Sequence, residues 1–289
     1  MRYRIAHTTS YEYSEPVSIC HNEARLVPRM TAFQMPGPTR LAIEPSAAEL
    51  CEDRDYFGNT VHFFTLEEAH ARFSVTAFSE VDVIPYEQPV LGLSPAWESV
   101  RDAARQDSSP DGLRALEYTL ESPYVRFSDG LFEYAAPSFS ARRPLLEAVF
   151  ELTRRLFADF KYEPGSTTIA TPLDDVLATR RGVCQDFAHL ELGMLRMLGL
   201  PARYVSGYVH NTPISAPRLQ GADATHAWLS VYCPGFGYVD FDPTNGTIPK
   251  DEHITLAWGR DFSDTSPLRG VILGGGEHRV RVGVDVSRI

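Results

Sequence analysis

The sequence has few cysteines and no long apolar run, and both shortages limit what the protein can be. Its 289 residues include four cysteines, and no two of them are spaced as CxxC. A disulfide framework is therefore not expected, and free thiols are the default. No stretch approaches the roughly 18 apolar residues of a membrane span, and the first residues lack the apolar core of a signal peptide. We expect a soluble, cytoplasmic protein with no membrane partner.

Basic residues are also in short supply. The 27 lysines and arginines face 38 acidic residues, which gives a formal net charge of -11 at pH 7. Such a surface repels phosphate backbones, so nucleic acid is not an expected partner. The sequence contains no EF-hand loop, and the cysteines, His189 and His210 lack the spacing of a zinc site. We therefore expect no metal and no cofactor.

What the sequence does contain is an ordinary globular composition, 43% hydrophobic and 22% charged, in a chain long enough for two packed parts. Residues 1–88 alternate in short runs broken by turn residues, which predicts an antiparallel β domain. Residues 89–140 hold five prolines and two weakly helical stretches, and we interpret them as a helical connector. Residues 141–289 combine helical periodicity with later alternating runs, which predicts an α+β core with a C-terminal β tail.

Cys184 is the candidate nucleophile. It follows Gly182 and precedes a run from Phe187 to Leu198 whose apolar residues recur at helical spacing until Gly199 ends it. The cysteine thus falls in the first helical turn, where free N–H groups and the helix dipole stabilise the reactive thiolate. The alternative is a small core residue, which is the role of most unpaired cysteines.

His226 and Asp242 are the candidate base and its orienting acid. Two alternating runs on either side of Cys233-Pro234-Gly235 predict a β-hairpin. If the turn is centred on Pro234, His226 lies directly opposite Asp242, close enough for the carboxylate to accept from an imidazole N–H. The acid would then fix the tautomer and leave the other ring nitrogen for the thiol. A turn centred later would break this register and make Asp240 the alternative acid.

The motifs around these residues resemble the transglutaminase-like core. The cysteine lies in RRGVCQDFAHL, and the histidine and acid lie in HAWLSVYCPGFGYVDFDPTNG. The early segments HTTSYEYSEPV, RLVP and DYFGN, and the late segment WGRDFSDTSPLRGVILGGGEH, are similar to a bacterial group of transglutaminase-like proteins in which a β domain precedes the core. The resemblance implies a papain-like core, in which a helix bearing the cysteine packs on an antiparallel sheet. It also implies Cys184 as nucleophile, His226 as base and Asp242 as orienting acid.

The resemblance leaves the stabilisation of the oxyanion open. Relatives of the papain type carry a glutamine six residues before the cysteine, where this chain has Ala178, and the tryptophan of animal transglutaminases has no nearby counterpart. The backbone N–H of Cys184 is one donor, and Tyr162 is a candidate for the second. Asp186 is a candidate supporting residue or, alternatively, a charge that stabilises the helix N-terminus.

These residues together predict acyl transfer through a thioester on Cys184, with a peptide or carboxamide as substrate. If water takes the acyl group, the protein is a peptidase or amidase, which analogy with small bacterial relatives favours. If a lysine amine takes it, the protein is a transglutaminase. A third alternative is a non-catalytic peptide-binding or assembly module, but its usual mark, loss of a triad residue, is absent. The sequence predicts no oligomeric state.

Overall fold

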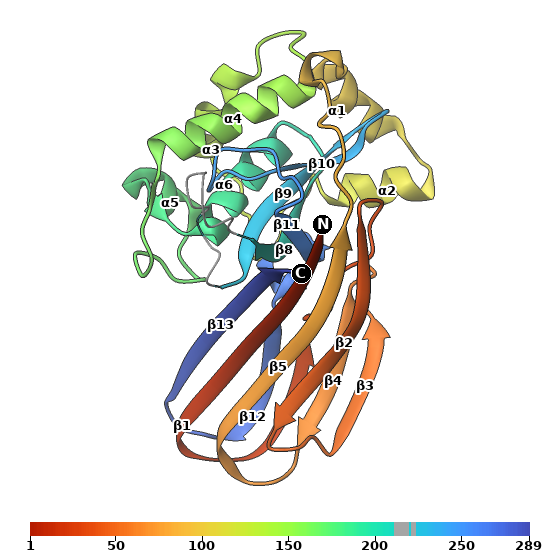
Figure 1. Cartoon of the computed structure of the whole chain (residues 1–289). Coiled ribbons are helices and arrows are strands. Elements are labelled where there is room, and N and C mark those ends of the chain that lie inside the picture. Colours follow the sequence, from red (N-terminus) through yellow and green to blue (C-terminus); the bar gives the residue numbers. More distant parts are fainter. Residues whose placement is uncertain (211–219, 221–223) are drawn as a thin grey trace.

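The computed structural model describes residues 1–210, 220 and 224–289, and it divides into a part made of long strands and a part rich in helices (Figure 1). The long strands lie at the bottom of the view, and the helices gather with a smaller sheet at the top. The two chain termini lie close together where the parts meet. This architecture confirms the expected α+β class, in which an antiparallel β region precedes the helical core.

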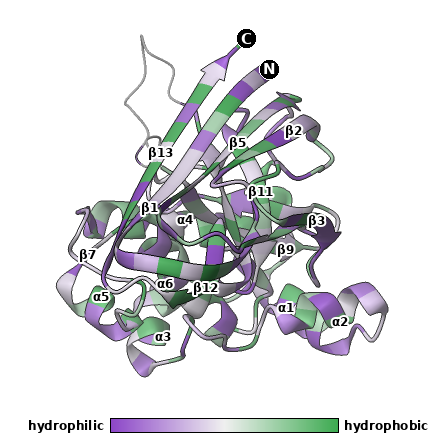
Figure 2. Cartoon of the chain, turned by 90° about the horizontal axis from the view of Figure 1, so that it is seen from below, coloured by the Kyte–Doolittle hydropathy of each residue, from purple (hydrophilic) through white to green (hydrophobic). Residues whose placement is uncertain are grey.

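The strand β1 (Arg2–Ala24) is central to the larger sheet. Along part of this sheet the strand order is β2 (Gln34–Glu44), β5 (His70–Val83), β1, β4 (Thr60–Leu66) and β3 (Glu49–Arg54), with antiparallel neighbours. Burial alternates along the first half of β1, as a period of two requires. Figure 2 shows that hydrophilic and hydrophobic residues both lie along the long strands. The predicted tight turn before Asn59 joins β3 to β4, and Gly58 has a φ of 74° there.

The last two strands join this same sheet. Both β12 (Leu268–Gly274) and β13 (His278–Arg288) pair antiparallel with β1, and the short connector between them contains Gly275 and Gly276. The tail strands therefore lie in the N-terminal sheet, although the sequence analysis groups them with the core. The physical reason is the length of β1: β5 and β4 cover one of its edges, and without the tail the other edge would keep unpaired N–H and C=O groups.

Helices occupy the connector and the core. The structure places η1 (Leu91–Leu93), α1 (Trp97–Gln106), α2 (Pro110–Glu117), α3 (Asp129–Ala135) and η2 (Ala136–Ser138) in the connector, followed by α4 (Leu145–Asp159), α5 (Leu173–Thr179), α6 (Cys184–Met197) and the short α7 (Phe262–Thr265). The predicted α6 is confirmed, and Gly199 follows it with a φ of 76°. Pro144 is the N-cap residue of α4. The helix α5 follows Pro172 and ends before Gly182, since Arg180 takes a left-handed conformation at its C-cap.

The smaller sheet carries the second half of the core. Its order is β10 (Gly237–Phe241), β9 (His226–Cys233), β8 (Ala202–Val209) and β11 (His253–Gly259). The face that packs on α6 contributes Ala227, Leu229 and Val231 to one buried cluster with Leu190 and Leu195. A separate two-stranded pairing joins β6 (Lys161–Tyr162) to β7 (Arg181–Gly182), directly before α6. Among the described residues, no helix is both long and apolar enough to span a bilayer.

Candidate active site

The start of α6 is held by a carboxylate. Asp186 accepts hydrogen bonds from the Val183 N–H at 2.8 Å and from the Thr167 hydroxyl at 2.6 Å. A Cβ on Gly182 would lie 2.8 Å from that carboxylate, which explains the glycine at this position. Burial raises the pKa of Asp186, although both hydrogen bonds oppose the rise. Asp186 thus lies at the helix start and accepts a hydrogen bond from the N-cap residue Val183, as expected of a residue that stabilises the helix N-terminus.

Cys184 is the first residue of α6, and its side chain is 9% exposed. The first turn of a helix leaves backbone N–H groups without intrahelical acceptors, and these favour a thiolate. The parallel pairing of β6 with β7 puts Tyr162 beside Gly182, two residues before the cysteine. Tyr162 is half-buried against the core cluster, so it lies next to the segment that positions the thiol.

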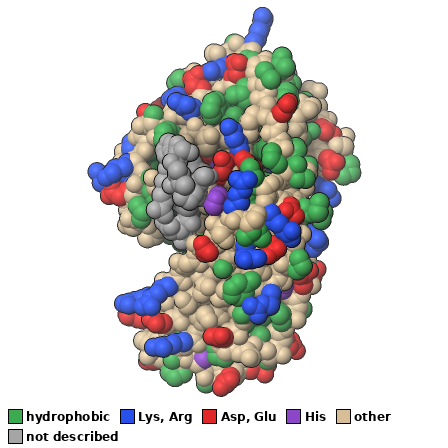
Figure 3. Space-filling view, viewed as in Figure 1, with side chains coloured by type: hydrophobic (Ala, Val, Ile, Leu, Met, Phe, Trp, Pro, Cys, Tyr) green, Lys and Arg blue, Asp and Glu red, His purple; other side chains and the backbone are tan. Residues whose placement is uncertain are grey.

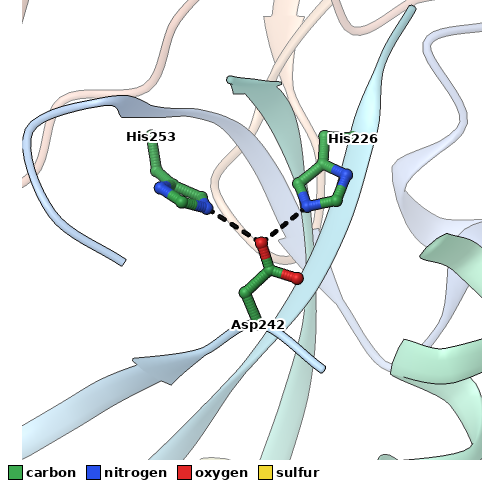
Figure 4. A group of neighbouring side chains, drawn as sticks. All are labelled: His226, Asp242 and His253. Carbon is green, nitrogen blue, oxygen red and sulfur yellow. Dashed lines mark hydrogen bonds and ion pairs between the residues drawn. The ribbon is translucent and has the colours of Figure 1, made fainter. Parts of the chain in front are cut away.

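His226 and Asp242 meet in the protein interior. The Nε2 atom of His226 lies 2.8 Å from Oδ2 of Asp242, and both side chains are fully buried (Figure 4). Asp242 directly follows β10, and its other oxygen accepts from the backbone N–H groups of Thr244 at 3.0 Å and Asn245 at 3.2 Å. These two hydrogen bonds orient the Asp242 carboxylate, so that its Oδ2 is positioned to accept from the imidazole of His226.

The predicted hairpin register was wrong, although the predicted contact exists. Cys233 pairs with Gly237 and Ser230 pairs with Asp240, so the turn is centred on Gly235 instead of Pro234. Moving the centre by one residue shifts the pairing by two, and side chains of the same parity keep the same face. Asp242 therefore remains on the face of His226, beyond the end of β10, and reaches it diagonally.

The alternative acid is engaged elsewhere. Asp240 accepts from the indole N–H of Trp228 at 3.0 Å and from the Ser230 hydroxyl. These contacts lie nearer the turn of the hairpin, whereas His226 is the first residue of β9, at the opposite end of the hairpin. Asp242 is thus the carboxylate that holds the imidazole.

The electrostatics favour a charged imidazole. Burial lowers the pKa of His226, but the charge and hydrogen bond of Asp242, and then the Cys184 thiol, outweigh burial and raise it above its ordinary value. Conversely, burial raises the pKa of Asp242, but the two histidines that contact it hold it well below its ordinary value. Nδ1 of His226 is buried and meets the geometry of a hydrogen bond with none of the described residues. The nitrogen free to exchange a proton with Cys184 is therefore Nδ1.

The sequence analysis missed two further residues at this carboxylate. Nε2 of His253 lies 3.0 Å from Oδ2 of Asp242, and Nδ2 of Asn245 lies 2.7 Å from the same oxygen. His253 begins β11, which pairs with β8, so the pattern of the β9–β10 hairpin carried no signal for it. Asn245 lies in the quoted motif DPTNG, three residues after the acid, where an asparagine is an ordinary turn residue.

The same cluster could in principle hold a metal. The ligand atoms of His226, Asp242 and His253 lie within 4.8 Å of one another. Both imidazoles, however, direct Nε2 at one carboxylate oxygen, so the donors and the acceptor satisfy each other by hydrogen bonding. The geometry favours a hydrogen-bonded relay over a metal centre.

Comparison with known proteins identifies both parts of the chain. The bacterial transglutaminase-like N-terminal region matches residues 3–82, and the transglutaminase-like superfamily matches residues 133–243. An uncharacterized protein of Mycobacterium tuberculosis (strain ATCC 25618 / H37Rv) is 40% identical over 294 residues, which covers 99% of this chain and 91% of that protein. An uncharacterized protein of Mycobacterium leprae (strain TN) is 32% identical over 288 residues and covers 100% and 99%.

Two further similarities concern proteins with a stated activity. The protein-glutamine gamma-glutamyltransferase of Pseudomonas aeruginosa (strain PAO1) is 32% identical over 108 residues, 34% of this chain and 16% of that protein. A crystal structure from Cytophaga hutchinsonii, described as a candidate cysteine protease, has a TM-score of 0.76 at 24% identity and covers 99% of this chain and 90% of that one. The latter shows a shared fold. The match to the transglutaminase-like superfamily supports a thiol-dependent enzymatic activity in general. Because relatives align along nearly their whole length and both regions match, the chain belongs to the transglutaminase-like superfamily and carries its bacterial N-terminal region.

Proposed function

We propose that this protein catalyses thiol-dependent acyl transfer on peptide or carboxamide substrates, with Cys184 as nucleophile, His226 as base and Asp242 as orienting acid. One observation carries the proposal. Cys184 lies at the N-terminus of α6 and helps to raise the pKa of His226, and Nε2 of His226 lies 2.8 Å from the buried carboxylate of Asp242. This is the arrangement that activates a thiol for attack on a carbonyl carbon.

The proposed reaction has two halves. In the first, Nδ1 of His226 takes the thiol proton and the sulfur of Cys184 attacks the carbonyl carbon, while the Cys184 N–H donates to the oxyanion. The imidazolium then gives its proton to the leaving ammonia or amine, the C–N bond breaks, and a thioester remains. In the second half the imidazole deprotonates the acceptor, the acceptor displaces the sulfur, and the thiol is regenerated. Asp242 keeps the tautomer with its proton on Nε2 throughout.

Hydrolysis is the leading form of the reaction, with peptide or protein as substrate and the cytoplasm as location. Transfer to an amine is the second candidate, and it is supported by the similarity of about a third of the chain, 34%, to the protein-glutamine gamma-glutamyltransferase of Pseudomonas aeruginosa. Water and an amine use the same thioester, so the two forms differ only in the acceptor. A non-catalytic peptide-binding role is the outcome to be expected if Cys184 proves unreactive.

Thiol alkylation tests the proposal without knowledge of the substrate. All four cysteines are free, and Cys51 is exposed whereas Cys184 is 9% exposed. With limiting iodoacetamide at pH 6, peptide mass spectrometry should find Cys184 alkylated faster than Cys51, because Cys184 begins a helix and has His226 as a neighbouring base. His226→Gln should reverse that order. Faster alkylation of Cys51 in the unaltered protein would contradict the assignment.

Two aspartates of the β9–β10 segment, Asp242 fully buried and Asp240 half-buried, provide a pair for the acyl-transfer assay. Asp242→Asn should lower turnover at least about tenfold, because an amide at this position favours the wrong imidazole tautomer. Asp240→Asn removes a carboxylate whose hydrogen bonds among the described residues go to Trp228 and Ser230, so it should retain turnover. Turnover is followed as ammonia release, new amino termini and incorporation of a fluorescent amine into casein. Equal effects of the two substitutions would refute the role of Asp242.

A further inference from the structure

A cavity of about 620 Å³ opens on the face of the smaller sheet that lies opposite α6. Alternate strand residues such as Arg203, Ser230 and Asp240 line it, whereas their neighbours in sequence face the helix. The segment 31–34 and Tyr86, from the N-terminal part, complete its wall. Figure 3 shows basic, acidic and histidine side chains gathered in the middle of the face it draws. The cavity has the size of a small-molecule site, and its lining does not include Cys184.

Arg203 is the unusual residue of this cavity. Its guanidinium carbon lies 3.8 Å from the ring centroid of Tyr238 and 3.7 Å from that of Trp258, so aromatic rings cover the faces of the group. Among the described residues, none accepts a hydrogen bond from this guanidinium or lies within ion-pair distance of it, and its Nε is buried. A guanidinium has five N–H donors, and the edge that carries them is left for a partner from outside the chain.

Arg29 packs on the same ring, that of Trp258, and provides a comparison for Arg203. Its guanidinium carbon lies 3.5 Å from the centroid of Trp258. Arg29 nevertheless donates to the Asn59 side chain at 2.6 Å and to the Phe57 carbonyl at 2.8 Å. The two arginines share an aromatic neighbour, but only Arg29 is hydrogen-bonded within the described chain. Arg203 is half-buried, and although the charge of Asp240 acts on it, none of the described residues accepts a hydrogen bond from it, so packing alone is a poor explanation of Arg203.

The other polar groups of the wall are mostly committed to the protein. Asp240 accepts from Trp228 and Ser230, Tyr86 donates to the Pro249 carbonyl, and Gln34 bonds to backbone groups. His253 is the exception: its Nε2 contacts Asp242, but its Nδ1 is buried without a hydrogen-bond partner in the part of the chain that the structure describes. Arg203 and Nδ1 of His253 thus lack hydrogen-bond partners among the described residues, and Arg203 is cationic.

We propose that this cavity binds a small organic carboxylate, whose two oxygens pair with the free edge of Arg203 and whose apolar body packs against Phe33 and Phe236. The planar fork of a guanidinium matches a carboxylate in geometry, and each paired bond is charge-assisted. Phe33 is 44% exposed and Phe236 is 36% exposed at the wall, which leaves aromatic surface for a ligand to cover. The site is separate from the thiol, and the proposal does not depend on the reaction assigned to Cys184.

Calorimetric titration with matched acids and amides tests this binding site. Phenylacetate and hexanoate are compared with phenylacetamide and hexanamide, which have similar shapes without the charge. At least one acid should bind saturably and at least tenfold more tightly than its amide. Cys184→Ala should bind it with unchanged affinity, which separates this result from any failure of the proposed reaction. Saturable binding by neither acid, or equal affinity for acid and amide, would overturn the proposal.

Two variants locate the carboxylate. Arg203→Met should remove the preference for the acid, whereas Lys250→Met, at an exposed cation of the same wall, should change the affinity less than threefold. Urea unfolding serves as the folding control: removing a half-buried charge that has no hydrogen-bonded acceptor among the described residues should leave stability equal or higher. Arg203→Lys keeps the charge but not the fork, so it should weaken acid binding while folding normally. An undiminished acid preference in either Arg203 variant would refute the assignment of Arg203.

Discussion

Glu191 lies in the middle of α6 with its side chain fully buried. Its Oε1 accepts from the Thr153 hydroxyl at 2.7 Å, and its Oε2 has no partner among the described residues. Burial, opposed by the hydrogen bond of Thr153 and assisted by the charge of Asp242, raises the pKa of Glu191 from an ordinary 4.5 to about 8. The folded protein therefore keeps this side chain protonated at neutral pH.

The protonated state makes stability depend on pH in a defined direction. Between pH 4.5 and about 8 the unfolded chain has released this proton while the folded chain retains it, so Glu191 lowers stability as pH rises. At about 1.4 kcal/mol per pKa unit the whole interval corresponds to roughly 5 kcal/mol as an upper bound, and the interval from pH 5 to pH 7 to nearly 3 kcal/mol.

Glu191→Gln removes the titration but keeps an acceptor for Thr153. Its stability relative to the unaltered protein should therefore increase by about 2–3 kcal/mol between pH 5 and pH 7. Urea unfolding followed by circular dichroism at both pH values measures this difference. Glu133→Gln, at an exposed glutamate of α3, is the control and should show no such increase. A Glu191→Gln effect of equal size at pH 5 and pH 7 would refute the reasoning.

Three further predictions concern the surroundings of the site. His253→Gln should slow alkylation of Cys184 about threefold to tenfold and alter its pH profile, because Asp242 loses one of the donors on Oδ2; an unchanged profile would limit His253 to packing. Asp186→Ala should lower the free energy of unfolding by about 1–2 kcal/mol in urea, since Val183 and Thr167 lose their acceptor, and a neutral result would contradict the capping role. Incubation with EDTA should leave the alkylation rate of Cys184 unchanged, whereas a loss reversed by zinc would show that the histidine cluster holds a metal.

The predictions that succeeded are those that depend on neighbouring residues. The periodicity from Phe187 to Leu198 and the following Gly199 place α6 correctly, because the spacing of apolar residues reports the face that a helix buries. The turn residues around Pro234 likewise predict the β9–β10 hairpin. The predicted strand pairing of this hairpin was wrong, because the turn is centred on Gly235 and not on Pro234. The residues around the two positions suit a β-turn equally well.

The predictions that failed or were not made depend on partners distant in sequence. The pairing of β12 and β13 with β1 joins residues more than 240 positions apart, and no local pattern selects β1 over another strand edge. His253 reaches Asp242 only because β11 lies next to β8 in the sheet. The same holds for Arg203, whose lack of a hydrogen-bond partner is a property of its surroundings.

The amino-acid sequence by itself therefore determined the helix that begins at Cys184, the hairpin that carries His226 and Asp242, and the β character of the first 88 residues. Each follows from interactions within a few positions of the chain, where side-chain spacing and turn chemistry act directly. The tertiary structure alone decided which atoms meet: Nε2 of two histidines at one carboxylate oxygen, and a guanidinium between two rings. Such contacts are set by how sheets and helices pack, which sums small contributions from the whole chain.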